Sequence, residues 1–303
     1  MQIIQIKNAI YLKQIKPSPP TLNAQPKVHK QNMPIRPLIN NTKAPSHKLA
    51  RHLDKTIRQY ITLTNNTSIK NNIDLVNKLQ NIHVPHNSTL ASFDITNLYT
   101  NIPIQETTEI LEDLLKNNRT PETHIREIIT LTNTITKQNY FTHNNKFYTQ
   151  IDGVPMGSPI SSILAEIFIH HIEQKYILHN NKHAHKILYW HRFVDDIILL
   201  YKGNKRQVEN FHKYINSIHP KLKFIIDIEK DNSINFLDLT ITKQNNTHMY
   251  KIYRKPTTTD MVIRKLSNHP TQHKHAAFNH MLHRLTKIPI NKQDYDNELN
   301  IIK

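Results

Sequence analysis

Two adjacent aspartates, Asp195 and Asp196, lie between two apolar runs, ILYW at 187–190 and IILLY at 197–201. Runs rich in Ile, Leu and aromatic residues favour β-strands, so the pair predicts a β-hairpin with both carboxylates at its tip. Two carboxylates ~4 Å apart repel each other by about 4 kcal/mol at an effective dielectric constant of ~20. A divalent cation would remove this repulsion, although an ordinary acidic turn is the alternative for such a pair taken alone.

A third carboxylate, Asp94, follows another strand-like run, LASF at 90–93. Three acidic side chains at strand ends could hold two Mg²⁺ ions about 3.5–4 Å apart, the arrangement used for in-line displacement at phosphorus. The pattern therefore indicates phosphoryl-transfer chemistry, with Asp94, Asp195 and Asp196 as candidate metal ligands.

The charge balance points to a polyanionic partner. The 303 residues include 40 Lys and Arg against 23 Asp and Glu, a formal net charge of +17. Such an excess favours nucleic acid binding, with a merely basic surface as the alternative. There is no Cys, which excludes disulfides, and the 21 His show no clear four-ligand zinc set. No apolar run is long enough to span a membrane, and the N-terminus lacks the apolar core of a secretory signal.

Hydrophobic periodicity predicts a mixture of helices and antiparallel strands. Strands are expected at 90–95 and 222–228, and hairpins at 140–149 and 187–201. The run at 233–241 alternates and is expected to pair with 249–253. Helices are expected at 68–82, after Pro103, at 122–137, after 159 and at 205–218, with Ser158 as an N-cap and Pro159 at the first helical position. The first 48 residues show no clear period. This is an α+β pattern.

Ordered motifs resemble those of reverse transcriptases, and most closely those of Penelope-like retroelements. Segment 92–103 (SFDITNLYTNIP) resembles the first catalytic motif, 153–159 (GVPMGSP) the second and 192–196 (RFVDD) the third. NFLD at 235–238 resembles the primer-gripping hairpin, and YRKPT at 253–257 the segment leading to the thumb. PKVHK at 26–30 and IRPL at 35–38 resemble the fingers, so the resemblance runs in order over about residues 26–285.

The resemblance implies the right-hand polymerase fold of fingers, palm and thumb. We expect the lead-in and fingers over 1–89, and a palm with an antiparallel sheet over 90–253 that holds a fingers insertion at about 104–150. A basic, truncated helical thumb would begin at 254 and run to 303. The chain shows no GIY-YIG endonuclease, and TLNAQ at 21–25 departs from the aromatic-Gly-Leu run of the family.

The resemblance further implies an RNA-directed DNA polymerase, a nucleotidyltransferase that extends a DNA primer with dNTPs on an RNA template. Asp94, Asp195 and Asp196 would be its catalytic residues and would hold two Mg²⁺, or Mn²⁺ in their place. The alternatives are a template-dependent polymerase of another kind and a truncated, inactive retroelement remnant that only binds nucleic acid. A retroelement's need to reach chromosomes implies a nuclear or cytoplasmic location, and the oligomeric state does not follow from the sequence.

The resemblance assigns further binding residues. Tyr99 would exclude a 2′-hydroxyl from the incoming nucleotide, with a core tyrosine as the alternative. Gly157, beside Met156, would let the backbone approach the template or the nucleotide base, or would simply open a helix. Arg36 and Lys30 would bind triphosphate oxygens, with solvated basic residues as the alternative. The residues expected to contact primer or template are Phe236, Leu237, Arg254, Lys255, Arg264 and Lys265.

Overall fold

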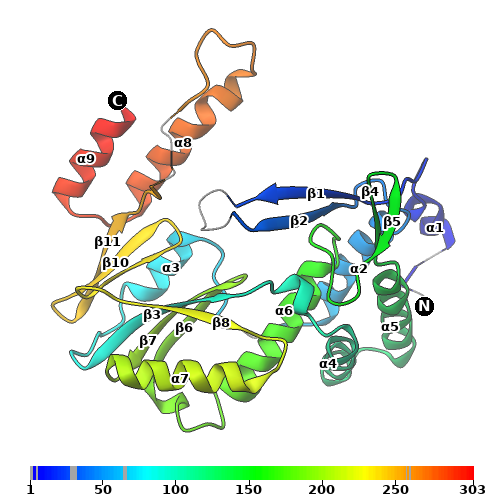
Figure 1. Cartoon of the computed structure of the whole chain (residues 1–303), viewed down its shortest axis with the longest axis horizontal. Helices are drawn as coiled ribbons and strands as arrows, with labels where there is room; N and C mark the ends of the chain where they lie inside the picture. The colour runs from blue at the N-terminus through cyan, green and yellow to red at the C-terminus, as the bar shows by residue number, and fades with distance from the viewer. Residues whose placement is uncertain (1–2, 5, 28–32, 64–66, 257, 259–260) are drawn as a thin grey trace. The chain divides into compact units, whose positions relative to one another are not determined.

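The computed structural model of the chain describes residues 3–4, 6–27, 33–63, 67–256, 258 and 261–303. Its elements, drawn in Figure 1, fall into two compact units. The first comprises Met1–Asn65, Thr96–Asn181 and Ile218–Lys223, and the second comprises Asn66–Ile95, Lys182–Ser217 and Phe224–Lys303. The three acidic residues singled out by the sequence therefore all belong to the second unit.

The first unit combines a four-stranded sheet with helices. The sheet order is β2-β1-β4-β5, in which β1 pairs with β2 antiparallel and with β4 parallel. The strands β1 and β2 lie in the part of the chain for which periodicity gave no prediction. The elements are α1 (Ile6–Leu12), β1 (Thr21–Pro26), β2 (Ile35–Asn40), α2 (His47–Tyr60), η1 (Tyr99–Asn101), α4 (Ile104–Asn117), α5 (Glu122–Lys137), β4 (Tyr140–His143), β5 (Lys146–Thr149), α6 (Ser161–Ile172) and η2 (Glu173–Ile177).

The second unit contains two antiparallel sheets. The large sheet has the order β6-β7-β3-β8 and the small sheet the order β11-β10-β9. The elements are α3 (Asn72–Leu79), β3 (Ser88–Ile95), η3 (Ala184–Lys186), β6 (Ile187–Phe193), β7 (Asp196–Lys202), α7 (Lys205–Ile218), β8 (Phe224–Ile228), β9 (Ser233–Phe236), β10 (Leu239–Gln244), β11 (Thr247–Ile252), α8 (Thr271–Lys287) and α9 (Lys292–Ile302).

One face of the large sheet packs against α7 through aromatic side chains. The ring of Phe93 on β3 lies 5.7 Å from that of Trp190 on β6, and Trp190 lies 6.1 Å from Phe211 on α7. Because successive side chains of a strand point to opposite faces, Phe93 on this face places Ser92 and Asp94 on the other.

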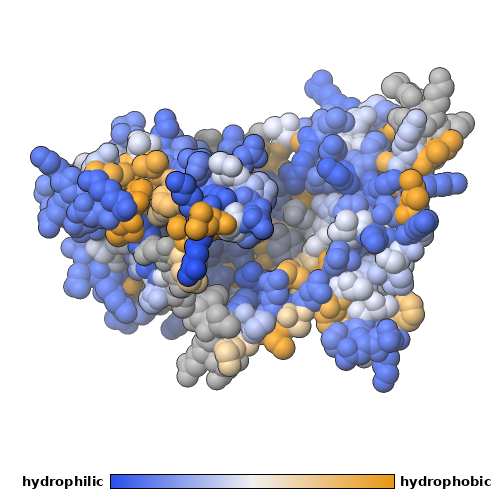
Figure 2. All heavy atoms as spheres, turned by 90° about the horizontal axis from the view of Figure 1, so that it is seen from above, coloured by the Kyte–Doolittle hydropathy of each residue, from blue (hydrophilic) through white to orange (hydrophobic). Residues whose placement is uncertain are grey.

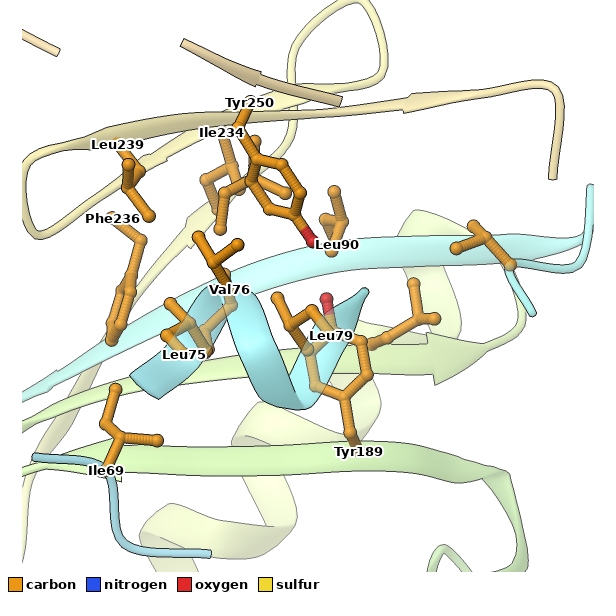
Figure 3. Packing of buried hydrophobic residues seen from close by; sticks show 14 of the residues in the cluster. Ile69, Leu75, Val76, Leu79, Leu90, Tyr189, Ile234, Phe236, Leu239 and Tyr250 are labelled. Carbon is orange, nitrogen blue, oxygen red and sulfur yellow. The ribbon is translucent and has the colours of Figure 1, made fainter. Parts of the chain in front are cut away.

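The opposite face packs against α3 and the small sheet. Figure 3 shows Leu75 and Leu79 of α3 beside Leu90 of the large sheet and Ile234 of the small sheet. Leu75, Leu79 and Leu90 are fully buried, and burying each such side chain stabilises the fold by roughly 1.5–3 kcal/mol. This core fixes the small sheet over one end of the large sheet and leaves the other end of the same face for polar residues.

Asparagine replaces glycine in the tight turns. Two-residue hairpin turns of the favoured type need a positive φ at both central residues, and Asn and Asp tolerate this conformation better than other residues with a side chain. Because the chain has only 3 Gly, the turns use Asn and Asp instead. Such turns, with positive φ at both positions, are formed by Asn144-Asn145, Asp231-Asn232 and Asn245-Asn246.

Most of the predicted elements are confirmed, although the helix expected at 68–82 spans only Asn72–Leu79, and two further details were wrong. The helices at 122–137 and 205–218 have the expected bounds. The helix after Pro159 begins only at Ser161, with Ile160 rather than Ser158 at the N-cap, because Ser158 N–H and Ser161 Oγ–H both donate to the Pro155 carbonyl in a separate turn. The run 233–241 is two strands, since the chain reverses at Leu237 and Asp238 between β9 and β10.

Among the described residues, no helix is long and apolar enough to cross a bilayer. Figure 2 shows one face of the molecule, on which hydrophilic residues predominate and apolar residues gather in separate groups. The apolar surface of this face is therefore divided rather than continuous.

Candidate active site

Asp94 of β3 and Asp196 of β7 are direct partners in the antiparallel register. Opposed residues of such a pair point to the same face, with their Cβ atoms roughly 4.5–5.5 Å apart. Leu90 and Leu200, partners further along the same two strands, lie in the core beneath α3. The period of two therefore brings both carboxylates to the polar end of this face, where their side chains are half-buried.

A strained turn carries the third aspartate. Val194 and Asp195 connect the paired residues Phe193 and Asp196, and Val194 has a φ of 57°. A β-branched residue in the left-handed region is a genuine outlier and costs about 1–3 kcal/mol, a strain that is typical of functional sites.

Two hydrogen bonds hold this turn in place. Ile95 N–H donates to the carbonyl of Asp195 at 3.0 Å, and Arg192 Nη1 donates to the carbonyl of Val194 at 3.2 Å. Because Ile95 follows Asp94 in the chain, the first bond joins the turn directly to the strand of the first aspartate. The structure thus brings all three predicted carboxylate-bearing residues to one end of the large sheet.

A cleft of about 690 Å³ opens at this end of the sheet. Its lining comes from β3, the end of β6, β7 and β8, the start of α3, the end of β9 with the β9–β10 turn, the segment after β11, and α8. The lining residues include Asn71, Ser92, Asp94, Phe193, Asp196, Ile225, Asp227, Phe236, Leu237, Asp238, Tyr253, Lys255 and His280.

The cleft is acidic although the chain is basic. Among the cleft-lining residues that the structure describes, four are aspartates, Asp94, Asp196, Asp227 and Asp238, and Lys255 is the one Lys or Arg. In the described part of the chain, no three His, Asp or Glu side chains gather closely enough to enclose a metal ion by themselves. Mg²⁺ rarely needs such a cage, since it is usually bound by one or two carboxylates together with waters and substrate phosphates. The facing carboxylates of Asp94 and Asp196 offer oxygen ligands of the kind that Mg²⁺ takes.

The β9–β10 turn forms another part of the cleft wall. Leu237 has a φ of 53° and a half-buried side chain, and it lines the cleft together with Phe236, which is 4% exposed and packs in the core. The carbonyl of Asp238 accepts hydrogen bonds from Tyr253 N–H at 2.9 Å and from Arg284 Nη2 on α8 at 3.5 Å. The turn is thus anchored from two other elements.

The basic residues predicted to contact primer or template differ in their surroundings. The guanidinium of Arg254 is partly buried and pairs with Glu298 on α9, with Nη2 2.7 Å from Oε2. Lys255 is exposed and lines the cleft. Arg264 and Lys265 are exposed on the segment before α8. Of these four, Lys255 is the one that shares the cleft with Asp94 and Asp196.

The remaining predicted residues belong to the first unit. The carbonyl of Tyr99 accepts a hydrogen bond from Val154 N–H at 2.7 Å, which joins η1 to the 153–159 loop. Arg36 is exposed on β2. Lys30 lies outside the described residues.

Close backbone packing explains the glycine of the same loop. The carbonyl of Met156 accepts a hydrogen bond from Ile39 N–H at 2.8 Å. At Gly157, which has a φ of 121°, a Cβ would lie 2.1 Å from the carbonyl oxygen of Ile39. The glycine is therefore required by the approach of β2, whatever contact it makes with a substrate.

Sequence reasoning missed several residues that line the cleft. Asp227 shares the face of Asp94, because its partner in β3 is Ser92. The sequence predicted that Asp227 lies in a strand, but it did not show that this strand pairs with β3. No local pattern marked Tyr253 or His280.

A model of the family described as reverse transcriptase (RNA-dependent DNA polymerase) matches residues 28–272. No curated protein matches the chain. Its structure is similar to a telomerase from Candida albicans bound to a TWJ fragment of telomeric RNA, with 12% identity and a TM-score of 0.59 over 99% of this chain and 56% of that one.

Two further solved structures are similar. A telomerase from Candida tropicalis, also bound to a TWJ fragment, gives 12% identity and a TM-score of 0.54 over 96% of this chain and 53% of that one. The BmCPV RNA-dependent RNA polymerase in its elongation state gives 11% identity and a TM-score of 0.53 over 94% of this chain and 26% of that one. The chain spans about half the length of the telomerase chains. At this identity the likeness shows the fold alone, the right-hand polymerase fold.

Proposed function

The chain belongs to the reverse transcriptase (RNA-dependent DNA polymerase) family, and from this premise we propose that it is an RNA-directed DNA polymerase. It adds dNTPs to the 3′-end of a DNA primer on an RNA template. The observation that carries the proposal is the register that sets Asp94 directly opposite Asp196 at the open end of the large sheet. The acidic cleft beside this pair supplies room for a primer end.

Asp94, Asp195 and Asp196 would hold two Mg²⁺, with Mn²⁺ as a substitute. When bound, such ions activate the primer 3′-hydroxyl and neutralise the charge of the triphosphate and of the departing pyrophosphate. The protein itself contributes positioning, which accounts for most of the catalysis in phosphoryl transfer. Arg192 supports this role, because its guanidinium donates to the strained turn that carries Asp195.

The other residues around the cleft would hold the primer. Leu237 presents its side chain from an anchored turn, and Lys255 and His280 offer cationic or polar contacts for phosphates from two further elements. Because Arg254 pairs with Glu298, we propose that it holds α9 in place. If Arg254 also contacts nucleic acid, it does so while its guanidinium is paired with the Glu298 carboxylate. Arg264 and Lys265 would contact the duplex further from the cleft.

The first unit would bind the incoming nucleotide. Tyr99 excludes the 2′-hydroxyl, Met156 and Gly157 present backbone to the base, and Arg36 with Lys30 contacts triphosphate oxygens. The motif resemblance supports a Penelope-like retroelement as the origin of the chain. Its fingers, palm and thumb would be divided as the sequence predicts. It would act in the nucleus or the cytoplasm.

Primer extension on poly(rA)/oligo(dT) with dTTP and Mg²⁺ tests the proposal. We expect extension by the native chain and a loss of about a thousandfold or more in Asp195→Asn. Asp231→Asn is the matched control, because Asp231 is an exposed residue of a tight turn in the same unit. Its φ is positive, and Asn tolerates this conformation as well as Asp does. Binding of the primer–template without extension by the native chain would instead indicate an inactive retroelement remnant.

A further inference from the structure

The β4–β5 hairpin of the first unit presents two aromatic and two basic side chains on one face. Asn144 and Asn145 form its two-residue turn, so the register is fixed, with Phe141 opposite Tyr148 and His143 opposite Lys146. Residues two apart on a strand share a face. Phe141, Tyr148, His143 and Lys146 therefore lie together on one side of the hairpin.

The aromatic pair is ordered yet open to solvent. The rings of Phe141 and Tyr148 are stacked, with centroids 5.6 Å apart and an interplanar angle of 17°. Tyr148 is 43% exposed, and neither ring belongs to the buried core. β5 is an edge strand, and its four residues are all exposed. Phe141 is half-buried, and a stacked aromatic pair that is partly open to solvent is a platform for another flat ring.

The charge around this platform selects the partner. No Asp or Glu occurs between Glu127 and Asp152, and the Asp152 carboxylate is paired with Lys221. Lys146 and His143 stand next to the stack on the same face. A second copy of the chain would bring an equally basic surface, since the net charge is +17. An exposed aromatic stack beside Lys146 and His143, in a stretch of the chain without Asp or Glu, matches the way proteins bind single-stranded nucleic acid.

We propose that this face of the β4–β5 hairpin binds single-stranded RNA. Bases stack on Phe141 and Tyr148, and Lys146 and His143 contact the phosphates on either side. The inference rests on the proposed function for its choice of RNA, because an RNA-copying enzyme must hold unpaired template. It assigns a role to a hairpin that lies outside the three catalytic motifs.

A tryptophan reporter tests the contact without any need for activity. The native chain has a single Trp, Trp190, which is 2% exposed. We expect the added emission of Tyr148→Trp to be quenched by a single-stranded RNA 12-mer of mixed sequence and not by the same RNA as a duplex. Phe147→Trp is the matched control, because Phe147 is 68% exposed on the opposite face of the hairpin, and its emission should change little.

Affinity measurements provide the second readout. Base stacking on an aromatic side chain is worth roughly 1–3 kcal/mol per base, so the double variant Phe141→Ala/Tyr148→Ala should bind the 12-mer at least about tenfold more weakly. Phe147→Ala should bind like the native chain. Lys146→Ala should lower the slope of log K against log salt by ~0.7. Circular dichroism of each variant separates a lost contact from a lost fold.

Three results would overturn the proposal: equal quenching at positions 147 and 148, unchanged affinity of the double variant, or Tyr148→Trp emission that depends on protein concentration without RNA. The last would show that a second copy covers the platform. Failure of the proposed function is distinguishable, because Asp195→Asn should keep the quenching reported from Tyr148→Trp while it loses extension. Quenching of Tyr148→Trp by RNA, together with a native chain that never extends a primer, would refute the polymerase and leave the hairpin site standing.

Discussion

Asp94 and Asp196 oppose each other across neighbouring strands, on a face that is apolar only a few residues away. Without a cation their charges repel, so removing one charge should stabilise the fold. We expect Asp196→Asn in EDTA to raise the free energy of unfolding by about 1 kcal/mol, or the melting temperature by roughly 2–4 °C. Millimolar Mg²⁺ should then stabilise the native chain and not the variant. Thermal melts with and without Mg²⁺ measure both effects, and a variant less stable than the native chain in EDTA would contradict them.

The turn at Val194 stores strain that glycine would release. Gly adopts a positive φ without steric cost, and the side chain of Val194 is 42% exposed, so little burial is lost. We expect Val194→Gly to be more stable than the native chain by about 0.5–1 kcal/mol in urea unfolding. The same change should slow single-nucleotide addition about tenfold, because the looser turn no longer fixes Asp195. A less stable Val194→Gly chain would show that the turn is not strained.

His248 should make the second unit sensitive to acid. Burial lowers the pKa of His248 to about 4, with Lys243 adding to the effect, and its Nε2 lies 3.3 Å from the hydroxyl of Tyr189. Below about pH 6.5 the unfolded chain takes up a proton at this residue that the folded chain refuses until about pH 4, so stability falls over this window.

This loss should amount to about 2 kcal/mol between pH 7.5 and pH 5. Urea unfolding at pH 7.5 and pH 5 measures how far the free energy of unfolding falls between the two values. This fall should be smaller by that amount in His248→Gln than in the native chain. His275→Gln, on an exposed residue of α8, should leave it unchanged. A His248→Gln chain that keeps the full acid sensitivity would assign it to other groups.

Tyr99 should set the choice of sugar. If its ring excludes a 2′-hydroxyl, Tyr99→Ala should raise the rate of rNTP incorporation relative to dNTP incorporation by about tenfold or more. Tyr99→Phe keeps the ring and should keep the selectivity. The ratio of kcat/KM values for UTP and dTTP on poly(rA)/oligo(dT) measures this, and the same ratio in Tyr99→Ala and the native chain would remove the role.

The sequence predicted the acidic hairpin because its determinants are local. Two apolar runs joined by a short polar break define β6, β7 and their turn, and Asp195 and Asp196 follow from the pattern alone. Asp94 was added because it also ends a strand-like run, and the order of the motifs supported it, but no local pattern states that β3 pairs with β7.

What the sequence could not give depends on contacts between distant residues. Asp227 enters the cleft only because β8 pairs with β3, and His280 only because α8 returns to the β9–β10 turn. From the sequence Arg254 was expected to contact primer or template, and its ion pair with Glu298, far along the chain, is visible only in the structure. The strands β1 and β2 carry no alternating pattern, since neither face of either strand is consistently buried.

Single-nucleotide addition under single-turnover conditions, compared between the native chain, Asp94→Asn and Asp196→Asn, tests most directly whether the facing carboxylates perform the chemistry. We predict that each variant binds the primer–template with native affinity and that its addition rate falls by about a thousandfold or more at saturating dTTP and Mg²⁺. Addition at a rate close to that of the native chain in either variant would contradict the account.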